Sequence, residues 1–179
     1  MNLKRSAVSN SGPLIHLAKA GLLELIKLYD TVIPLEVKYE VVDKGKEKGF
    51  TDALLIEKAI EEGWIKVIDV SVDDKFAKAA EVAGLHKAEI TVIHYAYKNG
   101  ITALLDEDAA RFFARGLGVK VKGSLGLLIE GLREGLVSYS KAVKGLDDLS
   151  KIMYLSSDVY KLVLREIEKW KRFRKEELS

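Results

Sequence analysis

Short apolar runs alternate with segments of helical periodicity along most of this chain, and that alternation limits the possible folds more than any other feature. The apolar runs are residues 6–10, 31–33, 64–70, 101–105 and 119–121. The segments between them carry apolar residues at helical spacing, except for residues 43–49, which indicate a solvated turn. Strands that alternate with helices are typical of βαβ units, whose strands are parallel. We therefore predict an α/β protein with a mostly parallel sheet.

The strand pattern stops at Ser138. Residues 140–149 and 156–174 have helical periodicity, and Ser156 is a typical N-cap residue for the second of these helices. A chain of 179 residues has the usual size of one domain. We expect a domain over residues 1–137 and a helical extension over residues 138–179 that packs on it.

The composition excludes several classes of protein. The chain contains no cysteine, which excludes disulfide frameworks, thiolate zinc sites and cysteine nucleophiles. It has no Gly-rich nucleotide-binding motif, and its net charge of +2 neither requires nor excludes a nucleic-acid partner. No apolar run reaches the roughly 18 residues of a membrane span, and the start of the chain lacks the apolar core of a signal peptide. We expect a cytoplasmic protein that does not contact a membrane.

Polar residues follow two of the predicted strands at the point where the apolar runs end. Asn10 ends the first run, and Asp106, followed by Glu107 and Asp108, comes directly after the fourth. In open α/β sheets, ligands bind in the crevice beyond the carboxyl ends of the strands. These residues are therefore candidates for a binding or catalytic site.

Two further acids lie on predicted helices that the sheet can bring to the same edge. Glu40 lies on the helix after residues 31–33, and Glu89 lies in the first turn of a helix over residues 86–98. Carboxylates gathered at one edge repel one another unless they share protons or hold a cation. Mg²⁺ prefers oxygen ligands and usually keeps several waters, so two or three carboxylates suffice. The pattern therefore indicates a Mg²⁺ or Mn²⁺ site and phosphate chemistry.

Each acid also has a simpler interpretation. Glu89 near a helix start stabilises the helix dipole without any further function. Asp106 can cap the helix that follows it, and Glu40 can belong to an exposed face. Only the joint placement of the acids favours a metal site.

The remaining signals are weaker. His16 and His94 lie in apolar stretches, where we interpret them as histidines at the edge of the core. In the tail over residues 169–175, aromatic residues alternate with basic ones, a pattern that fits contact with RNA. The favoured alternative is a helix end whose basic residues face the negative pole of the dipole while Trp170 packs on the core.

Several segments of the chain resemble a PIN-like subfamily found widely in prokaryotes. The segments that carry the resemblance are 8–15 (VSNSGPLI), 33–37 (IPLEV) with Glu40, 88–93 (AEITVI), 104–107 (LLDE) with Ala110 and Arg111, and 121–126 (VKGSLG). They follow the order of the subfamily over residues 6–136. The resemblance implies a three-layer α/β/α sandwich with a central sheet of about four to five strands, followed by the C-terminal helices.

PIN domains are nucleases, and many are the toxin ribonucleases of toxin–antitoxin pairs, so the resemblance also implies an activity. Carried over position by position, the catalytic residues are Asn10, Glu40, Glu89 and Asp106. Mg²⁺ or Mn²⁺ would be held by Glu89, Asp106 and Glu40, with Glu107 as an auxiliary ligand. RNA would be the substrate, an antitoxin protein a partner, and a homodimer the expected assembly.

The first of these positions departs from the family pattern, because the nucleases usually have Asp where this chain has Asn10. Asparagine offers a carbonyl oxygen but no charge, which lowers the expected affinity for a metal ion. Three hypotheses remain. The first is a metal-dependent endoribonuclease of the PIN type, and the second is a catalytically weakened module that binds RNA or a protein. The third is an interaction protein whose C-terminal helices form a dimer or partner surface.

Overall fold

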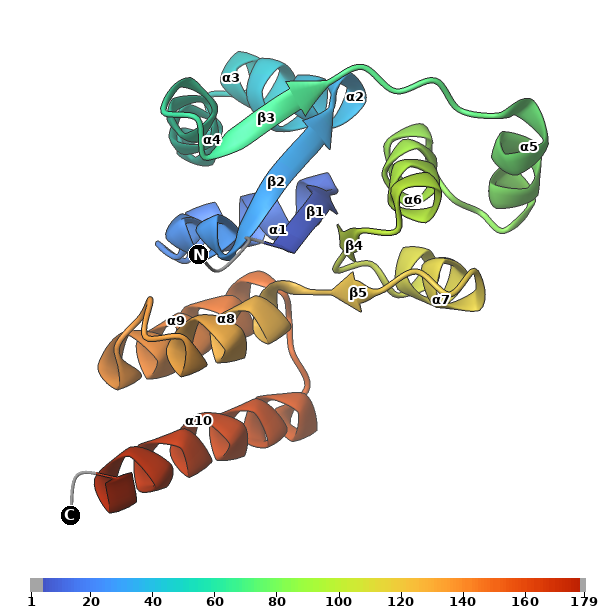
Figure 1. Cartoon of the computed structure of the whole chain (residues 1–179). Helices are drawn as coiled ribbons and strands as arrows, with labels where there is room; N and C mark the ends of the chain where they lie inside the picture. The colour runs from blue at the N-terminus through green and yellow to red at the C-terminus, as the bar shows by residue number, and fades with distance from the viewer. Residues whose placement is uncertain (1–4, 178–179) are drawn as a thin grey trace.

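The sheet has five parallel strands, and its order places the first strand at the centre (Figure 1). The structure is a computed structural model that describes the backbone of residues 5–177 and the side chains of residues 5–171. The strands are β1 (Arg5–Ser9), β2 (Tyr29–Pro34), β3 (Ile65–Ile68), β4 (Thr102–Leu104) and β5 (Val121–Lys122), in the order β3-β2-β1-β4-β5. Every neighbouring pair is parallel. The predicted α/β class and number of strands are confirmed.

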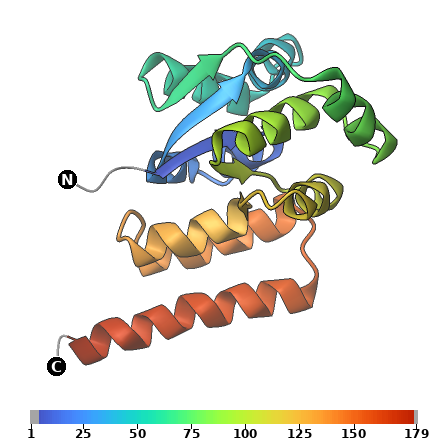
Figure 2. The same cartoon turned by 45° about the vertical axis from the view of Figure 1, so that its right-hand side comes forward.

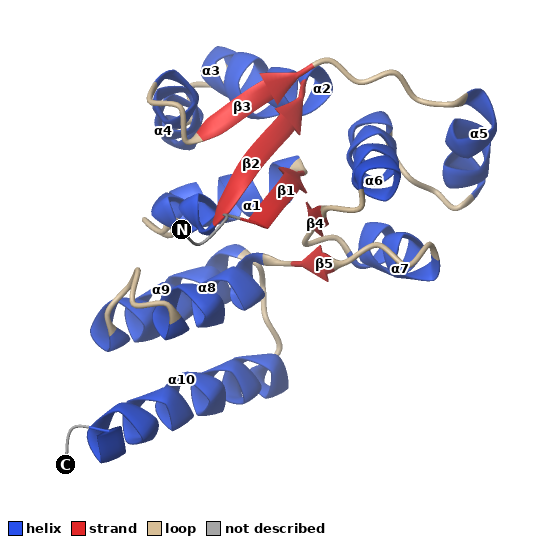
Figure 3. Ribbon diagram, in the orientation of Figure 1, coloured by secondary structure: helices blue, strands red, loops and turns tan. Residues whose placement is uncertain are grey.

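Helices cover both faces of this sheet, so the predicted three-layer sandwich is also confirmed (Figure 3). On one face, α6 (Lys87–Asn99) packs on β1, β2 and β4, with α5 (Asp74–Val82) and α7 (Asp108–Gly116) beside it. α6 follows a cap at His86 and ends at Gly100, which adopts the left-handed conformation that favours glycine. Nearly every residue in its first half is buried, because this helix lies directly on the sheet.

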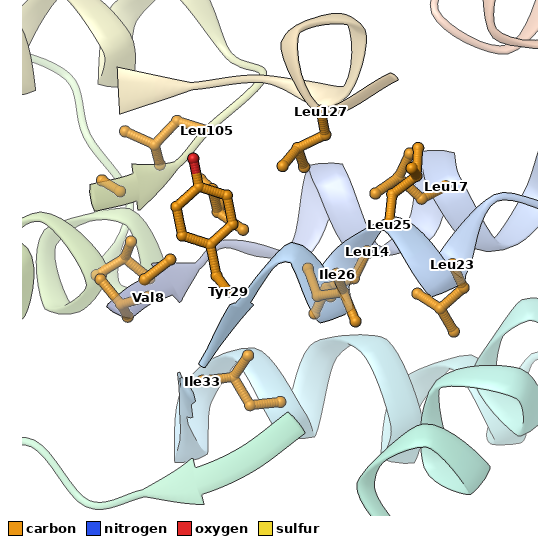
Figure 4. Packing of buried hydrophobic residues seen from close by; sticks show 14 of the residues in the cluster. Val8, Leu14, Leu17, Leu23, Leu25, Ile26, Tyr29, Ile33, Leu105 and Leu127 are labelled. Atoms are coloured by element: carbon orange, nitrogen blue, oxygen red, sulfur yellow. The ribbon is translucent and has the colours of Figure 1, made fainter. Parts of the chain in front are cut away.

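The opposite face is covered by α1 (Ser11–Lys19), which packs against α4 (Thr51–Glu61), α8 (Ser124–Arg133) and α9 (Tyr139–Ile152). Between α1 and β2, the chain forms a 3-10 helix, η1 (Leu23–Leu28). Figure 4 shows how side chains from these elements meet. The fully buried residues among those labelled there are Val8, Leu14, Leu17, Leu25, Ile26, Ile33, Leu105 and Leu127. The core therefore joins β1 and β2 to the layer that contains α1.

The turn expected over residues 43–49 is wrong, because most of this segment is helical. The chain runs from α2 (Leu35–Lys38) through a π-helix, η2 (Tyr39–Asp43), into α3 (Lys44–Glu47). Gly45 is buried where α3 meets α4, and a Cβ at this position would lie only 2.7 Å from the Cβ of Ala53. The glycine that suggested a turn therefore allows two helices to approach closely.

The last helix, α10 (Ser157–Glu177), packs along α8 and α9 (Figure 2). It buries Val163 and Ile167, and Trp170 packs against the core, as the favoured interpretation of the tail requires. The other aromatic side chain of the tail, and the basic ones after Lys171, lie outside the described side chains. Within residues 5–177, no helix combines the length and the apolar character needed to cross a membrane. The domain boundary expected after residue 137 stays a prediction.

Candidate functional site

The carboxyl ends of the two central strands bring Asn10 and Asp106 to neighbouring positions. β1 and β4 are adjacent and parallel, with Ser9 opposite Leu104. The ladder continues by one further hydrogen bond, in which the backbone N–H of Asn10 donates to the carbonyl oxygen of Leu104 at 3.0 Å. Asp106 follows two residues after Leu104, so both polar residues stand at the edge where parallel sheets bind ligands.

The side chain of Asn10 is buried without satisfying its oxygen. The residue is only 6% exposed, and Oδ1 has no hydrogen-bond partner among the described residues. Asn10 occupies the N-cap position of α1, yet its side chain makes no capping hydrogen bond to that helix. Nearly all buried polar atoms in proteins have a partner, because an unpaired one costs free energy. The Oδ1 atom is therefore a buried acceptor that the described residues leave unpaired.

Asp106 is held rigidly by three donors on two other elements. Oδ1 accepts from the backbone N–H of Ser124 at 2.7 Å, and Oδ2 accepts from the Ser124 hydroxyl at 2.6 Å. Nδ1 of His16 lies 2.7 Å from the same Oδ2. Burial alone would raise the pKa of the Asp106 carboxyl, but the hydrogen bonds from His16 and Ser124 outweigh it and hold the pKa below its usual range. The side chain is thus a buried carboxylate that is ionised at neutral pH.

Gly123 is the residue that makes room for this carboxylate. A Cβ at this position would lie 2.8 Å from Oδ1 of Asp106, 2.9 Å from a guanidinium nitrogen of Arg111 and 3.2 Å from the carbonyl oxygen of Leu105. Such contacts are too short for a side chain, and the backbone oxygen cannot move aside easily. Glycine at residue 123 is therefore required for the position of Asp106.

Glu40 approaches the same edge through a serine. Its Oε2 accepts a hydrogen bond of 2.5 Å from the hydroxyl of Ser11, the residue directly after Asn10. Glu40 lies in the π-helix η2 and is exposed. Short π-helical segments are frequent at functional sites. Glu40 thus lies on an exposed face, as the simpler interpretation has it, and also contacts Ser11 at this edge of the sheet.

Glu89 is buried at the start of α6, where its carboxylate caps the N-terminus of the helix. The residue is 8% exposed, and its Oε2 accepts from the backbone N–H of His86 at 2.9 Å. The role in helix stabilisation that we considered for Glu89 is therefore realised, and one carboxylate oxygen is occupied by it. Lys87, in the same turn of α6, forms an ion pair of 3.5 Å with Glu36 of α2, the helix that precedes η2 and Glu40.

Glu107 is exposed at the N-cap position of α7, and its side chain does not cap that helix. Asp106 does not cap α7 either, since its oxygens bind the start of α8. The auxiliary role of Glu107 stays a prediction.

The structure brings some of the predicted site residues together more closely than others. Asn10 and Asp106 end neighbouring strands, and Glu40 joins them through Ser11. Among the described residues, no three acidic or histidine side chains stand close enough to form a ready metal cluster. The candidate ligand atoms of Asn10, Asp106 and Glu40 are nonetheless all oxygens. The oxygen of Asn10 is unpaired among the described residues, and the carboxyl of Asp106 is ionised. Mg²⁺ and Mn²⁺ prefer oxygen ligands of this kind.

Sequence reasoning missed His16 and Ser124, the two residues that fix Asp106. We interpreted His16 as a histidine at the edge of the core, and its side chain is indeed only 21% exposed. No signal in the sequence pairs His16 with Asp106, although the structure shows why they meet: His16 follows Gly12 by four residues and so shares its helix face. Gly12 lies against Asp106, with a Cβ position 3.5 Å from that of the acid. The second histidine, His94, is buried against the ring of Phe76, as interpreted, and burial lowers the pKa of its imidazole.

Comparison with known families decides the identity of this fold. A family model described as a PIN domain matches residues 6–169. This chain belongs to the PIN domain family. The match extends beyond the segments that carried the resemblance and includes α9 and most of α10. No curated protein matches the chain.

Membership in the PIN family gives this chain a nuclease-type fold. PIN domains are generally dependent on divalent metal ions and their fold suggests RNA binding. In this PIN domain, the edge of the sheet that carries Asn10 and Asp106 is the region in which such chemistry has suitable donors.

Proposed function

We propose that this PIN domain is a Mg²⁺- or Mn²⁺-dependent endoribonuclease that acts at the edge carrying Asn10 and Asp106. The observation that carries the proposal is the buried, unpartnered Oδ1 of Asn10 next to a buried, ionised carboxylate. A cation would satisfy both groups at once, since an unpaired amide oxygen and an ionised carboxylate are both oxygen ligands of the kind that it prefers. Glu40, Glu89 and, as an auxiliary, Glu107 would complete the set of ligands.

The residues of this chain prepare the site in distinct ways. His16 and Ser124 fix the orientation of Asp106 and keep it ionised. Ser11 holds one oxygen of Glu40 beside Asn10 and leaves the other oxygen for a ligand. When bound, a divalent ion supplies polarisation of the phosphodiester and lowers the pKa of water.

The test is cleavage of labelled, mixed-sequence single-stranded RNA in Mn²⁺, in Mg²⁺ and in EDTA. We expect cleavage in either metal, none in EDTA, and none with Asp106→Asn. This variant should fold, because Asn keeps the shape of Asp, and both the Ser124 hydroxyl and His16 can accept a hydrogen bond from its amide. Circular dichroism provides the control. Cleavage by the folded Asp106→Asn protein would contradict the proposed site.

The biological setting that we propose is the toxin half of a toxin–antitoxin pair in the cytoplasm, acting as a homodimer. Kinship with the PIN family supports it. Induced expression of the chain in a bacterial host should then arrest growth, while expression of Asp106→Asn should not. Arrest by both proteins would count against a toxin that acts by cleavage, and light scattering of the purified protein tests the dimer.

A second function is favoured by one observation at the same site. Asn10 carries no charge, and the carboxylate of Asp106 already accepts three hydrogen bonds. A site of this kind suits a PIN domain that binds RNA without cutting it. Affinity for RNA that persists in EDTA, with no cleavage in either metal, would favour this binding module over the nuclease.

A further inference from the structure

A cavity of about 540 Å³ opens beside the start of α6, where α5 faces it. Its lining is mixed, and the apolar part includes Val72, Ala77, Leu85 and Ile90. Leu85 and Ile90 are buried, whereas Val72 and Ala77 are partly exposed, so one side of the cavity is open. Figure 2 shows α5 beside α6, joined to β3 and to α6 by segments without regular structure. The volume lies within the range of cavities that hold small organic groups, about 300–1,000 Å³.

The rim of the cavity is polar and carries both kinds of charge. Glu36 and Glu81 supply carboxylates, and His86 and Lys87 supply nitrogen donors. Lys87 pairs with Glu36 at 3.5 Å but leaves 84% of its side chain exposed. Glu81 is exposed and forms no ion pair with the described residues. The rim therefore offers carboxylate acceptors and an exposed ammonium group.

The cavity is continuous with the proposed catalytic edge. The backbone N–H of His86, a residue of the rim, donates to Glu89 at 2.9 Å. Glu36, on the opposite side of the rim, lies one helical turn before Glu40. The lining thus includes residues next to Glu89 along α6 and a residue one turn from Glu40, which places the cavity beside both acids.

We propose that this cavity binds one unpaired base of a single-stranded RNA, adjacent to the phosphate that the acid edge engages. The proposal rests on the proposed function, because it names the form of the substrate at that site. A base has flat apolar faces that match the walls, and an edge that hydrogen-bonds to groups such as those on the rim. Paired bases are stacked and cannot enter such a cavity unless they leave the helix. The site therefore selects single strands.

The rim also predicts which base enters. The carboxylates of Glu36 and Glu81 accept hydrogen bonds, and an exocyclic amino group donates them. Uracil lacks such a group, whereas adenine, cytosine and guanine carry one. Lys87, exposed beside Glu36, is placed to meet the phosphate that follows the base. We expect a base with an amino group at this position and discrimination against uracil.

The experiment measures binding of short single-stranded RNAs in EDTA by fluorescence anisotropy. Each RNA carries a single abasic nucleotide, moved one position at a time, and a second series carries uracil or cytosine at the sensitive position. The proteins are the wild type, Ala77→Phe, which fills the cavity, and Ala79→Phe, which adds the same ring on the exposed side of α5. Circular dichroism compares the folding of the two variants.

We expect one position at which an abasic nucleotide weakens binding to the wild type about tenfold, the effect of losing one well-packed base. Ala77→Phe should weaken binding of the intact RNA to a similar degree and then be insensitive to the abasic nucleotide, because both changes remove one interaction. Ala79→Phe should behave as the wild type. Equal sensitivity to the abasic nucleotide in Ala77→Phe and in the wild type would overturn the proposal.

The outcomes separate this proposal from the nuclease. If the abasic nucleotide and Ala77→Phe remove the same part of the binding affinity but no metal supports cleavage, the base cavity is retained and the nuclease is removed. Cleavage without a sensitive position would retain the nuclease and remove the base cavity. Failure to bind RNA in EDTA would also remove the base cavity, and cleavage in Mn²⁺ or Mg²⁺ would still decide on the nuclease. If Ala77→Phe does not fold, the abasic series with the wild type decides alone: a loss at one position supports the cavity, and small equal losses at all positions contradict it.

Discussion

Two buried carboxylates with lowered pKa values lie in this PIN domain, and their surroundings differ. Glu130 of α8 forms ion pairs with Arg5 and Lys122 and accepts a hydrogen bond of 3.0 Å from the hydroxyl of Tyr29. Burial alone would raise the pKa of Glu130, but Lys122 foremost lowers it. Asp106 is held instead by a serine, a backbone N–H and a histidine.

This difference in surroundings indicates a structural role for Glu130 and makes Asp106 the candidate for a functional role. The charge of Glu130 is compensated by two permanent cations, so nothing in its surroundings calls for another. Asp106 has no such compensation from Lys or Arg among the described ion pairs, and its neighbour Asn10 has an unpaired oxygen. A buried carboxylate that no Lys or Arg pairs keeps its negative charge available for an external cation. The comparison predicts that changes near Asp106 affect metal binding and cleavage, whereas changes near Glu130 affect stability alone.

The largest effect is expected from Gly123→Ala. The added Cβ would stand 2.8 Å from Oδ1 of Asp106 and 3.2 Å from a backbone oxygen, so the carboxylate must move. We expect cleavage to be lost and the free energy of unfolding to fall by about 1–3 kcal/mol, the usual range for overpacking. RNA cleavage and urea unfolding measure the two effects. Gly12→Ala is the matched control, because its Cβ would make only ordinary contacts of 3.5 Å or more. Cleavage by Gly123→Ala at the rate of the control would contradict the role given to this glycine.

A smaller and purely structural effect is expected from Glu130→Gln. The substitution turns an amide toward Lys122 and Arg5 and removes the charge that they share. We expect a loss of about 2 kcal/mol in the free energy of unfolding, as for hydrogen bonds to charged groups. Metal-dependent cleavage should stay at the wild-type level in conditions where the variant is folded. A selective loss of cleavage in stable Glu130→Gln protein would erase the distinction between the two acids.

The two acids should also share one behaviour, which is sensitivity to acid. The pKa of each is lower in the folded protein than its usual value. Such a group stabilises the fold above the usual carboxyl pKa of about 4 and loses that contribution as the pH falls through the folded value. We expect the free energy of unfolding in urea to decrease below about pH 4, and to decrease less steeply in Asp106→Asn and in Glu130→Gln. Identical pH dependence in the wild type and both variants would contradict the direction of the shifts.

The smallest effect is expected from Ser11→Ala, which removes the hydrogen bond to Glu40. Because Glu40 is exposed, stability should change by only about 0.5 kcal/mol or less. Cleavage should fall several-fold, since Glu40 would no longer be held beside Asn10, and the metal concentration required for cleavage should rise. A metal titration of the cleavage rate measures both. Ser6→Ala, at the other end of β1, is the control, and equal behaviour of the two variants would exclude the proposed role of Ser11.

Much of the fold could be predicted because local patterns decide it. The alternation of apolar runs gave the parallel sheet, and the start of α7 at Asp108 follows from the acid at a helix start. The helix α3 could not be predicted, because Gly45 is needed for a close contact with Ala53, a residue of another helix, and not for a turn. A glycine in a turn and a glycine in a tight helix contact look alike in one sequence.

The strands that carry the site residues could be predicted, but the hydrogen-bond partners of these residues could not. Strand ends placed Asn10 and Asp106 correctly at one edge. Which donors bind Asp106 depends on contacts with residues far along the chain, His16 and Ser124, and no local pattern specifies such pairs. The sequence suggested that Asp106 caps α7, the next helix, whereas the fold brings it to α8. The unpaired oxygen of Asn10 depends on burial from several elements and has no signature in the sequence.

The most direct test of the difference between the two acids is the binding of Mn²⁺ by isothermal titration calorimetry. The proteins to compare are the wild type, Asp106→Asn, Glu130→Gln and Asn10→Asp. We predict saturable binding to the wild type, no binding to Asp106→Asn, unchanged affinity in Glu130→Gln and tighter binding in Asn10→Asp, where the oxygen gains a charge. Equal affinity of the wild type and Asp106→Asn, or no binding to any of the four proteins, would contradict a cation site at this edge of the sheet.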